Sequence, residues 1–367
     1  MKTMQAMMLE QYGGPHAFKE RELPIPDPGA GEVRIRIDAV SVNPVDCKMR
    51  GGQLALLLPT VLGRDVAGFV DAVGKDTGGG ASGFAEGDRV MAVLFGPRSN
   101  GAYARYVTVP TAFVAHAPKT LSLAEEAATG VAGLTAYLAV NRAGSVSKSD
   151  AILVTGGAGG VGSFAIPLLR GRGIETIIAT AGSETSRRYL VDSLGQDPKH
   201  VVNYRGKDVA ALAADVAALA GPDGICQAFD FVGNEMKRPS FEAVGFEGSV
   251  VSVVEEGDKF SLPIWQPGGP MFEKSASYHF IATSARARYG APDDWASYRR
   301  WLDDWMAIMA SGDVTMPTVS VVGPLGEATL AEAHERLESG GTPGKLALTV
   351  EQKTGSRQPP TPGPYSH

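Results

Sequence analysis

The residues in this chain whose spacing most directly indicates chemistry are glycines near its middle. Gly157, Gly159 and Gly162 fit the pattern G-x-G-x-x-G, with Gly160 and Val161 between the last two. In such a turn the first glycine permits a tight bend, the second lets the backbone approach a pyrophosphate, and the third lets a helix pack closely on a strand. The helix N-terminus then offers free N–H groups and a partial positive charge to the phosphates. The spacing therefore predicts a turn that binds a dinucleotide.

The segments on either side give the glycines their structural context. Residues 151–155 are a short apolar run typical of a buried strand, and residues 161–171 are compatible with a helix. Pro167 removes one helical hydrogen bond, which is better tolerated near the first turn. A glycine-rich turn that binds nothing is the alternative interpretation. The strand before the glycines and the helix after them favour dinucleotide binding.

The second strand of this unit, expected over 175–180, bears on which dinucleotide binds. NAD-binding proteins usually place Asp or Glu at the end of this strand, about 20 residues past the glycines, to hold the ribose 2′-OH. No carboxylate stands at that end here, and Ser183, Arg187 and Arg188 follow. Guanidinium groups form charge-assisted pairs with phosphate, which favours NADP(H) as the cofactor. Ser183 is also a good helix N-cap, and Glu184 close by weakens the signal.

Apolar strands and helical stretches alternate around the glycine turn. Strands are predicted over 151–155, 175–180, 200–203, 225–231, 249–254 and 278–283, and helices over 161–171, 184–194 and 208–220. Strands that are apolar throughout and alternate with helices imply a parallel, doubly wound sheet, so the fold class is α/β. A ligand of such a sheet lies beyond the carboxyl ends of the strands.

Residues 1 to about 120 have a different pattern, that of antiparallel strands. Strands are predicted over 33–37, 69–73, 89–94 and 103–109, with an exposed flexible loop over 78–83. Strands separated by Gly- and Pro-rich turns suggest a compact, barrel-like, β-rich domain. Ser122 and Glu125 then fit a capping box at the start of an alanine-rich helix that runs through Ala139.

The C-terminal third continues with helices and one more strand. Apolar residues at helical spacing predict a helix over 293–309 that ends at Gly312, and its apolar stripe is expected to face the core. A last helix is predicted over 327–338 and a strand over 345–350. The Pro-rich tail, residues 351–367, is predicted to be disordered.

Composition and charge exclude several classes of function. The net charge is −6, and no cluster of Lys and Arg argues for a general nucleic-acid or anionic-membrane partner. Cys47 and Cys226 are too few for a Cys-rich zinc lobe or a secreted disulfide scaffold. No stretch is long and apolar enough to cross a bilayer, and the first residues lack a signal region. A cytoplasmic location is therefore expected.

Eight short motifs, in their order along the chain, resemble one protein family. They lie at 42–46 with 50–51, 63–68, 86–90, 133–136, 159–162, 202–205, 230–233 and 344–345. The chain resembles the medium-chain dehydrogenase/reductases, in the zinc-free quinone oxidoreductase branch related to zeta-crystallin. The resemblance implies a GroES-like catalytic domain (1–121 and 286–350) interrupted by a Rossmann domain (122–285) that binds NADP.

The resemblance also assigns residues to the cofactor. Asn43 and Thr135 are implied to hydrogen-bond the nicotinamide end, and Tyr204 to contact the 2′-phosphate. Val232 and Gly233 are expected on the loop after the fourth strand of the parallel sheet, beside the cofactor.

Lys48 is the residue that the resemblance singles out for catalysis, together with Asn43. Several enone-reducing relatives have lysine at this position, whereas zeta-crystallin-like members have tyrosine. A lysine near the nicotinamide could stabilise the oxygen of a developing enolate. The alternative is a solvated surface lysine. Asp46 either orients Lys48 or caps the helix that follows.

The chain departs from the zinc enzymes of this superfamily at their metal ligands. Those enzymes carry Cys near the position of Asn43 and Gly-His-Glu where Gly63, Arg64 and Asp65 stand here. Catalytic zinc requires three protein ligands around an open position. The six histidines are scattered along the chain, so no metal site is predicted.

Together these patterns predict an NADPH-dependent oxidoreductase that transfers hydride, without zinc, to a quinone or an α,β-unsaturated carbonyl compound (an enone or enoyl compound). The alternatives are a zinc-dependent alcohol dehydrogenase and a non-catalytic NADPH-binding protein with a regulatory or RNA-binding role. Phe95, Trp265 and Tyr278 are candidate pocket walls, with core packing as the alternative for each. The edge position of the sixth parallel strand predicts a homodimer.

Overall fold

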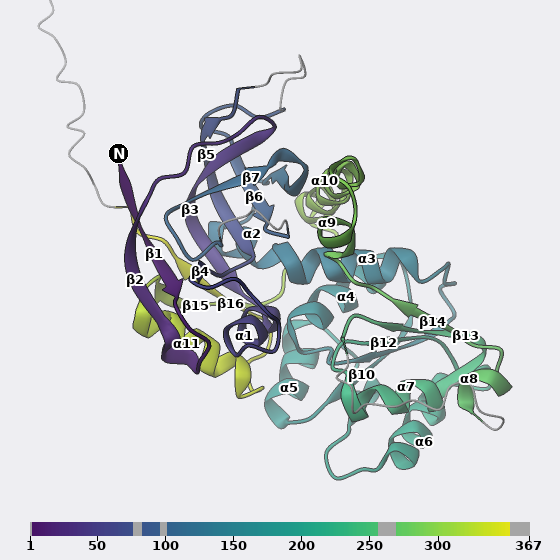
Figure 1. Cartoon of the computed structure of the whole chain (residues 1–367). Helices are drawn as coiled ribbons and strands as arrows, with labels where there is room; N and C mark the ends of the chain where they lie inside the picture. Colours follow the sequence, from purple (N-terminus) through teal and green to yellow (C-terminus); the bar gives the residue numbers. More distant parts are fainter. Residues whose placement is uncertain (1, 76–82, 96–100, 256–268, 353–367) are drawn as a thin grey trace, which may run out of the picture.

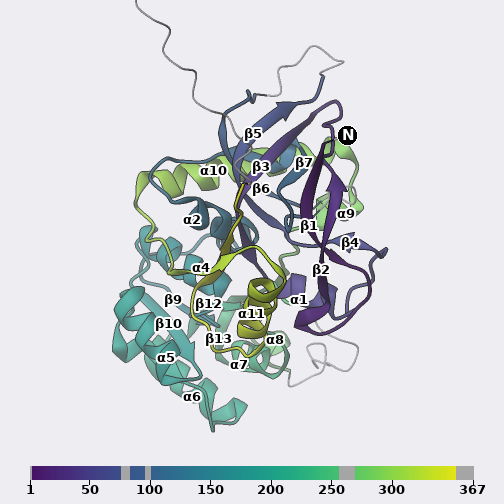
Figure 2. The same ribbon diagram turned by 90° about the vertical axis from the view of Figure 1, so that its left-hand side faces the viewer.

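The structure is a computed structural model that describes residues 2–75, 83–95, 101–255 and 269–352. Figure 1 shows two groups of strands, with helices α3 (Leu134–Arg142) and α4 (Gly160–Gly171) between them. Figure 2 shows the same two groups from the side, with the N-terminal strands uppermost. Trp265, most of the predicted loop at 78–83 and nearly all of the predicted tail lie outside the described residues.

The predicted doubly wound parallel sheet is confirmed by the structure. Six strands lie in the order β11-β10-β9-β12-β13-β14, and every neighbouring pair is parallel. They are β9 (Ala151–Thr155), β10 (Thr176–Ala181), β11 (Val201–Asn203), β12 (Ile225–Asp230), β13 (Val244–Ser252) and β14 (Ser277–Phe280). Strand β13 begins earlier than predicted because Glu247, with φ of 57°, interrupts its apolar pattern.

Both faces of this parallel sheet are covered by helices, as the apolar strands require. Val154 of β9 packs in the cluster that contains Phe164 of α4, whereas the neighbouring Leu153 packs with Leu212 and Phe241 on the other face. The helices on that second side are α6 (Val209–Ala220), α7 (Arg238–Ala243) and α8 (Pro270–Glu273). Helix α5 (Glu184–Arg188) follows β10 and continues as a π-helical turn to Ser193.

The other group of strands forms a seven-stranded sheet to which both ends of the chain contribute. The order is β15-β16-β3-β5-β6-β8, with β7 paired to β3. These strands are β3 (Glu32–Val42), β5 (Asp65–Val73), β6 (Arg89–Val93), β7 (Tyr106–Pro110), β8 (Val114–His116), β15 (Val319–Pro324) and β16 (Lys345–Thr349). Strand β16 pairs with β3, so the C-terminal segment completes the N-terminal sheet, as predicted.

Strands β1 (Thr3–Leu9) and β2 (Phe18–Pro24) are elements that the sequence analysis does not predict. They form a smaller sheet with β4 (Thr60–Val61), in the order β2-β1-β4. Residues 19–22 of β2 are all charged and exposed, so this strand has no alternation of apolar and polar residues by which it could be predicted. Charged residues are common on edge strands because they discourage pairing with other chains.

The predicted alanine-rich helix is present but broken. Helix α2 (Leu123–Ala128) starts at the predicted capping box, where Glu125 N–H donates to the Ser122 hydroxyl. A π-helical turn follows at Thr129–Gly133, in which Gly130 has a non-helical ψ of −108°, and α3 then resumes the helix. The Val131 N–H donates to Asp65 Oδ1 (2.7 Å) in strand β5, so a tertiary contact causes the break.

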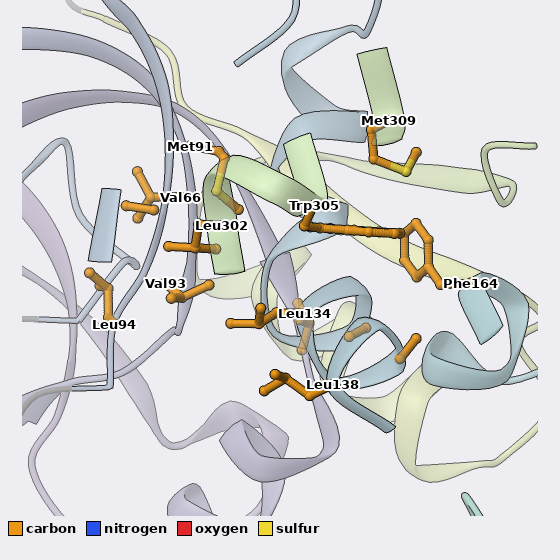
Figure 3. Packing of buried hydrophobic residues seen from close by; sticks show 14 of the residues in the cluster. Val66, Met91, Val93, Leu94, Leu134, Leu138, Phe164, Leu302, Trp305 and Met309 are labelled. Carbon is orange, nitrogen blue, oxygen red and sulfur yellow. The ribbon is translucent and has the colours of Figure 1, made fainter. Parts of the chain in front are cut away.

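Helix α10 (Ala296–Ser311) packs its apolar stripe into the core, as predicted, and ends at Gly312 in the left-handed conformation. Figure 3 shows Trp305 of α10 beside Phe164 of α4, with ring centroids 5.6 Å apart. Trp305 Nε1 donates to the Thr129 carbonyl (3.0 Å), and a Cβ on Gly133 would lie 2.7 Å from the indole ring. Trp305 therefore anchors the broken helix between the two sheets.

Helix α11 (Glu327–Glu338) has its predicted bounds.

Candidate active site

The glycine turn lies between β9 and α4, at the carboxyl end of the parallel sheet. Gly162 packs so closely that a Cβ there would lie 2.4 Å from the Gly156 carbonyl oxygen, so the third glycine of the pattern is needed for the predicted reason. The positive φ of the bend, 70°, is at Gly156 rather than Gly157. Gly159 is the N-cap of α4 and provides no side-chain cap, which leaves the helix N-terminus open to an anion.

The loop after β12 lies beside this turn. A Cβ on Gly156 would lie 2.8 Å from Val232 Cγ2, so the predicted cofactor residues Val232 and Gly160–Gly162 share one edge of the sheet. The N–H groups of Val232 and Gly233 both donate to Asp230 Oδ1, at 3.2 and 2.9 Å. Asp230, the first residue of the family motif at 230–233, thus holds this loop in place, a role that the sequence alone does not indicate.

At the end of β10, Ser183 and Arg187 occupy the positions where the sequence analysis expects a 2′-phosphate. The Ser183 hydroxyl accepts from the Ser186 N–H (3.1 Å), so it caps α5. Arg188 pairs with Glu184 (3.1 Å). The Arg187 side chain has no hydrogen bond or ion pair to any described residue, which leaves its guanidinium available to a ligand.

Tyr204 reaches the same place from the segment after β11. Its hydroxyl packs on Gly182, where a Cβ would lie 2.2 Å away, so only glycine at 182 allows this position. Arg205 Nε donates to the Gly182 carbonyl (2.7 Å) and ties the two segments together. Arg205 belongs to the family motif at 202–205, but no sequence signal indicates this role.

The residues predicted for the nicotinamide end come from separate elements. Asn43 is the N-cap of helix α1 (Pro44–Arg50) and is buried. Lys48 lies on α1 and is half-buried, and its ammonium has no hydrogen bond or ion pair to a described residue. Thr135, on α3, shares a 2.8 Å hydrogen bond with the Thr283 hydroxyl, beyond β14. Thr283 is a neighbour that no sequence signal indicates.

A buried ionic network joins Asn43 to three other segments. Asp65 Oδ2 accepts from Asn43 Nδ2 (2.8 Å) and from the Ser41 hydroxyl, and Asp65 Oδ1 accepts from the Val131 N–H. Lys345 Nζ lies 3.7 Å from Asp65 Oδ2. Asp65 and Lys345 belong to the quoted motifs, but the sequence analysis assigns neither to the site. Their contact is invisible in sequence because the two residues lie at opposite ends of the chain.

Asp46 caps helix α1, one of the two roles that the sequence analysis allows it. Its Oδ2 accepts from the Asn43 N–H (2.9 Å), and its side chain is completely buried. Burial raises the pKa of Asp46 to about 7, against the opposing effect of the Arg64 guanidinium. Arg64 itself donates to the Leu94 carbonyl and lies 3.3 Å from Met49 Sδ.

Cys47 is buried, and its thiol is packed rather than reactive. Its Sγ lies 3.3 Å from His334 Nδ1, and His334 Nε2 lies 3.3 Å from the Tyr103 hydroxyl. Burial, and next the nearby Asp46, raise the pKa of the Cys47 thiol to about 12. Burial also lowers the pKa of His334 to about 3, so this histidine is neutral and satisfied in the core.

The described residues contain neither a cluster of metal ligands nor a helix that could cross a membrane. Among those residues, no three His, Cys, Asp or Glu side chains are grouped closely enough to hold a metal ion. No described helix has the length and apolar character that crossing a membrane requires.

Comparison with known proteins agrees with this geometry. Residues 29–119 match the alcohol dehydrogenase GroES-like domain, and residues 160–277 match the zinc-binding dehydrogenase family. The 2-methylene-furan-3-one reductase of Solanum lycopersicum is 32% identical over 94% of this chain and 79% of its own length. The chloroplastic quinone-oxidoreductase QR1 of Triphysaria versicolor is 37% identical over 58% of this chain, and the match spans only 64% of that protein. The solved structure of mycobacterial Rv1454c complexed with NADPH is 26% identical, covers 94% of this chain and 99% of its own, and has a TM-score of 0.79.

The parallel sheet, its glycine turn and the β-rich domain define a two-domain dehydrogenase that binds a nicotinamide cofactor. The chain belongs to the medium-chain dehydrogenase/reductase superfamily, in the quinone oxidoreductase branch related to zeta-crystallin. This confirms the family and the fold that the sequence predicts.

The raised pKa of Asp46 predicts how stability depends on pH. In an unfolded chain Asp titrates near about 3.9, so the folded protein binds more protons between about pH 4 and 7. The stabilisation from protonated Asp46 is therefore complete below pH 4 and is lost as the pH rises to about 7. Asp46→Asn keeps an acceptor for the Asn43 N–H but does not titrate. We expect its Tm to exceed that of the wild type by a small margin at pH 5 and by a larger one at pH 8, where the difference in the free energy of unfolding is at most about 4 kcal/mol.

Thermal unfolding of both proteins at the two pH values measures this difference. His334, whose pKa is lowered, makes stability rise with pH between about 3 and 6.5, but it does so in both proteins and cancels. A difference in Tm that is the same at pH 5 and pH 8 would contradict the prediction.

Proposed function

We propose that this protein is an NADPH-dependent reductase of quinones or α,β-unsaturated carbonyl compounds that works without zinc. The observation that carries the proposal is the network around Asp65 and Asn43. These residues stand where zinc-containing relatives place metal ligands, yet here they bind each other and lie beside the Lys345 ammonium. The names of the relatives, a quinone-oxidoreductase and a 2-methylene-furan-3-one reductase, support the same chemistry.

The geometry fits a nicotinamide dinucleotide. The glycine turn leaves no room for a Cβ at Gly162, and the start of α4 has no side-chain cap. Bound there, the reduced cofactor supplies hydride from its nicotinamide C4. Asn43 and Thr135 orient the nicotinamide end, and the half-buried Lys48 stabilises negative charge on the substrate oxygen. A small carbonyl or quinone molecule is thus the expected substrate, and a proton completes its reduction.

Oxidation of NADPH at 340 nm, with 1,4-benzoquinone and with 3-buten-2-one, tests this function. We expect turnover with at least one of the two acceptors. Lys48→Met should lower kcat for 3-buten-2-one about 10- to 100-fold, because an oxyanion loses a charged donor in the transition state. The exposed Lys119, replaced by Met, is the matched control. No oxidation of NADPH with either acceptor would refute the function, and an unchanged kcat would remove Lys48 from it.

The preference for NADP(H) over NAD(H) is part of the proposal. It is supported by the Ser183 hydroxyl and the unpaired Arg187, on the segment that follows β10, and by the Tyr204 hydroxyl, which packs on Gly182. An arginine–phosphate pair is charge-assisted, and its loss lowers the binding affinity strongly when the phosphate has no other counter-ion.

Arg187→Ala should raise the KM for NADPH about 10-fold or more and leave the KM for NADH unchanged, since NADH lacks the 2′-phosphate. Arg188→Ala is the matched control because this neighbouring guanidinium already pairs with Glu184. Steady-state kinetics with both cofactors measure the effect. Equal effects of the two substitutions, or equal effects on NADPH and NADH, would show that Arg187 does not select the cofactor.

A homodimer in the cytoplasm is also proposed. Strand β14 is the edge of the parallel sheet, and Phe280 at its end is 72% exposed, with Phe246 and Phe272 also exposed. An exposed apolar edge favours pairing with a second copy. Free Cys47 and Cys226 support a reducing compartment. The net charge of −6 gives no reason to expect a nucleic-acid partner.

Light scattering on the purified protein should give the mass of a dimer. Phe280→Asp should convert it to a monomer, because a charge would be buried at the pairing edge. Leu57→Asp, at a site that is 94% exposed in the other sheet domain, is the control and should remain dimeric. A monomeric wild type would contradict the proposal.

A further inference from the structure

The function described so far gives the buried ammonium of Lys345 no role in hydride transfer. Lys345 begins β16 and is only 3% exposed. Its Nζ lies 2.6 Å from Asn43 Oδ1 and 3.1 Å from the Val42 carbonyl oxygen, and 3.7 Å from Asp65 Oδ2. A charged lysine is rarely buried unless it is paired and hydrogen-bonded, so these contacts are what keep it there.

The contacts of Lys345 and Asp65 leave the Asn43 amide a single orientation. An ammonium can only donate hydrogen bonds, and a carboxylate can only accept them. Asn43 therefore turns Oδ1 to Lys345 and Nδ2 to Asp65 (2.8 Å). The flipped amide would bring its NH₂ group against the ammonium and its oxygen against the carboxylate. Both contacts would be repulsive, and both would be buried, where water cannot relieve them.

Lys345 also touches the turn that receives the cofactor phosphates. The N–H of the preceding Gly344 donates to the Ala158 carbonyl (2.9 Å), inside the glycine turn. A Cβ on Gly160 would lie 3.1 Å from Lys345 Cδ. One residue thus joins the phosphate end of the site to Asn43 at its nicotinamide end.

We propose that Lys345 is a positioning residue for hydride transfer, which holds the Asn43 amide in the one orientation that presents an Nδ2–H to the nicotinamide. The inference rests on the proposed function. It assigns Lys345 no contact with substrate, because its ammonium is already satisfied by protein oxygens. Its effect therefore passes through Asn43, and its loss should slow the chemical step more than it weakens binding of the cofactor.

Two variants separate positioning from charge balance. Lys345→Met removes the ammonium and keeps the length of the side chain. The double variant Lys345→Met/Asp65→Asn also neutralises the carboxylate, so it leaves no unpaired buried charge. Lys119→Met is the control, since Lys119 is exposed. The measurements are kcat with 1,4-benzoquinone and 3-buten-2-one, the Kd of NADPH from the fluorescence of the bound cofactor, and Tm.

We expect both variants to lose about 100-fold in kcat, the size of effect that a misplacement of about 1 Å produces, with a much smaller change in the Kd of NADPH. The double variant should regain Tm relative to Lys345→Met but not kcat. A kcat near the wild type in Lys345→Met, or its recovery in the double variant, would overturn the proposal, because the lysine would then serve only charge balance. If Lys345→Met fails to fold, the crystal structure of the wild-type protein with NADPH decides.

A crystal structure of the wild-type protein with NADPH gives a test that is independent of turnover. It should show Lys345 Nζ on Asn43 Oδ1 and Asn43 Nδ2 directed to both Asp65 and the nicotinamide. A flipped amide, or an ammonium that leaves Asn43 for the cofactor phosphate, would overturn the inference. If the wild type oxidises no NADPH with either acceptor, the proposed function fails, and the crystal still decides whether Lys345 orients Asn43.

Discussion

The buried carboxylate of Asp65 is the group on which the arrangement of this molecule depends. It accepts hydrogen bonds from Ser41, Asn43 and the Val131 N–H, and the Lys345 ammonium lies 3.7 Å away. A carboxylate without water is stable only where donors and an opposite charge replace its hydration. Removing one partner of a buried ion pair typically costs about 3–5 kcal/mol. Asp65 therefore joins the segments that carry these groups, which are far apart in the sequence.

The same carboxylate shapes the helix that enters the parallel-sheet domain. Gly130 stands so close to Asp65 that a Cβ would lie 2.3 Å from Oδ1, and the helix breaks there. The helix resumes as α3, which places Thr135 toward Thr283, and Trp305 packs against the break. Electrostatics at Asp65 and packing at Trp305 thus set where the two sheets meet, and with them the distance between Asn43 and the glycine turn.

The sequence was sufficient for those parts of the fold whose signal is local. Apolar runs that alternate with helical stretches predicted all six parallel strands, and Ser122 with Glu125 marked the start of α2. The break at Gly130 could not be predicted, because an alanine-rich sequence favours an unbroken helix and only a distant carboxylate ends it. Strand β2 could not be predicted for a related reason. Its charged residues form a strand only because β1 supplies the paired backbone.

At the site, the sequence by itself determined the glycine turn and the absence of a carboxylate at the end of β10, since backbone freedom and side-chain charge are properties of a short segment. Asn43, Thr135 and Tyr204 came from family resemblance, and their contacts with a cofactor stay predictions. Only the tertiary structure decided what surrounds them. Lys345 meets Asn43 across 302 positions of sequence, and Tyr204 fits only above Gly182. Such contacts depend on how strands from both ends of the chain register in one sheet, and no local pattern encodes that register.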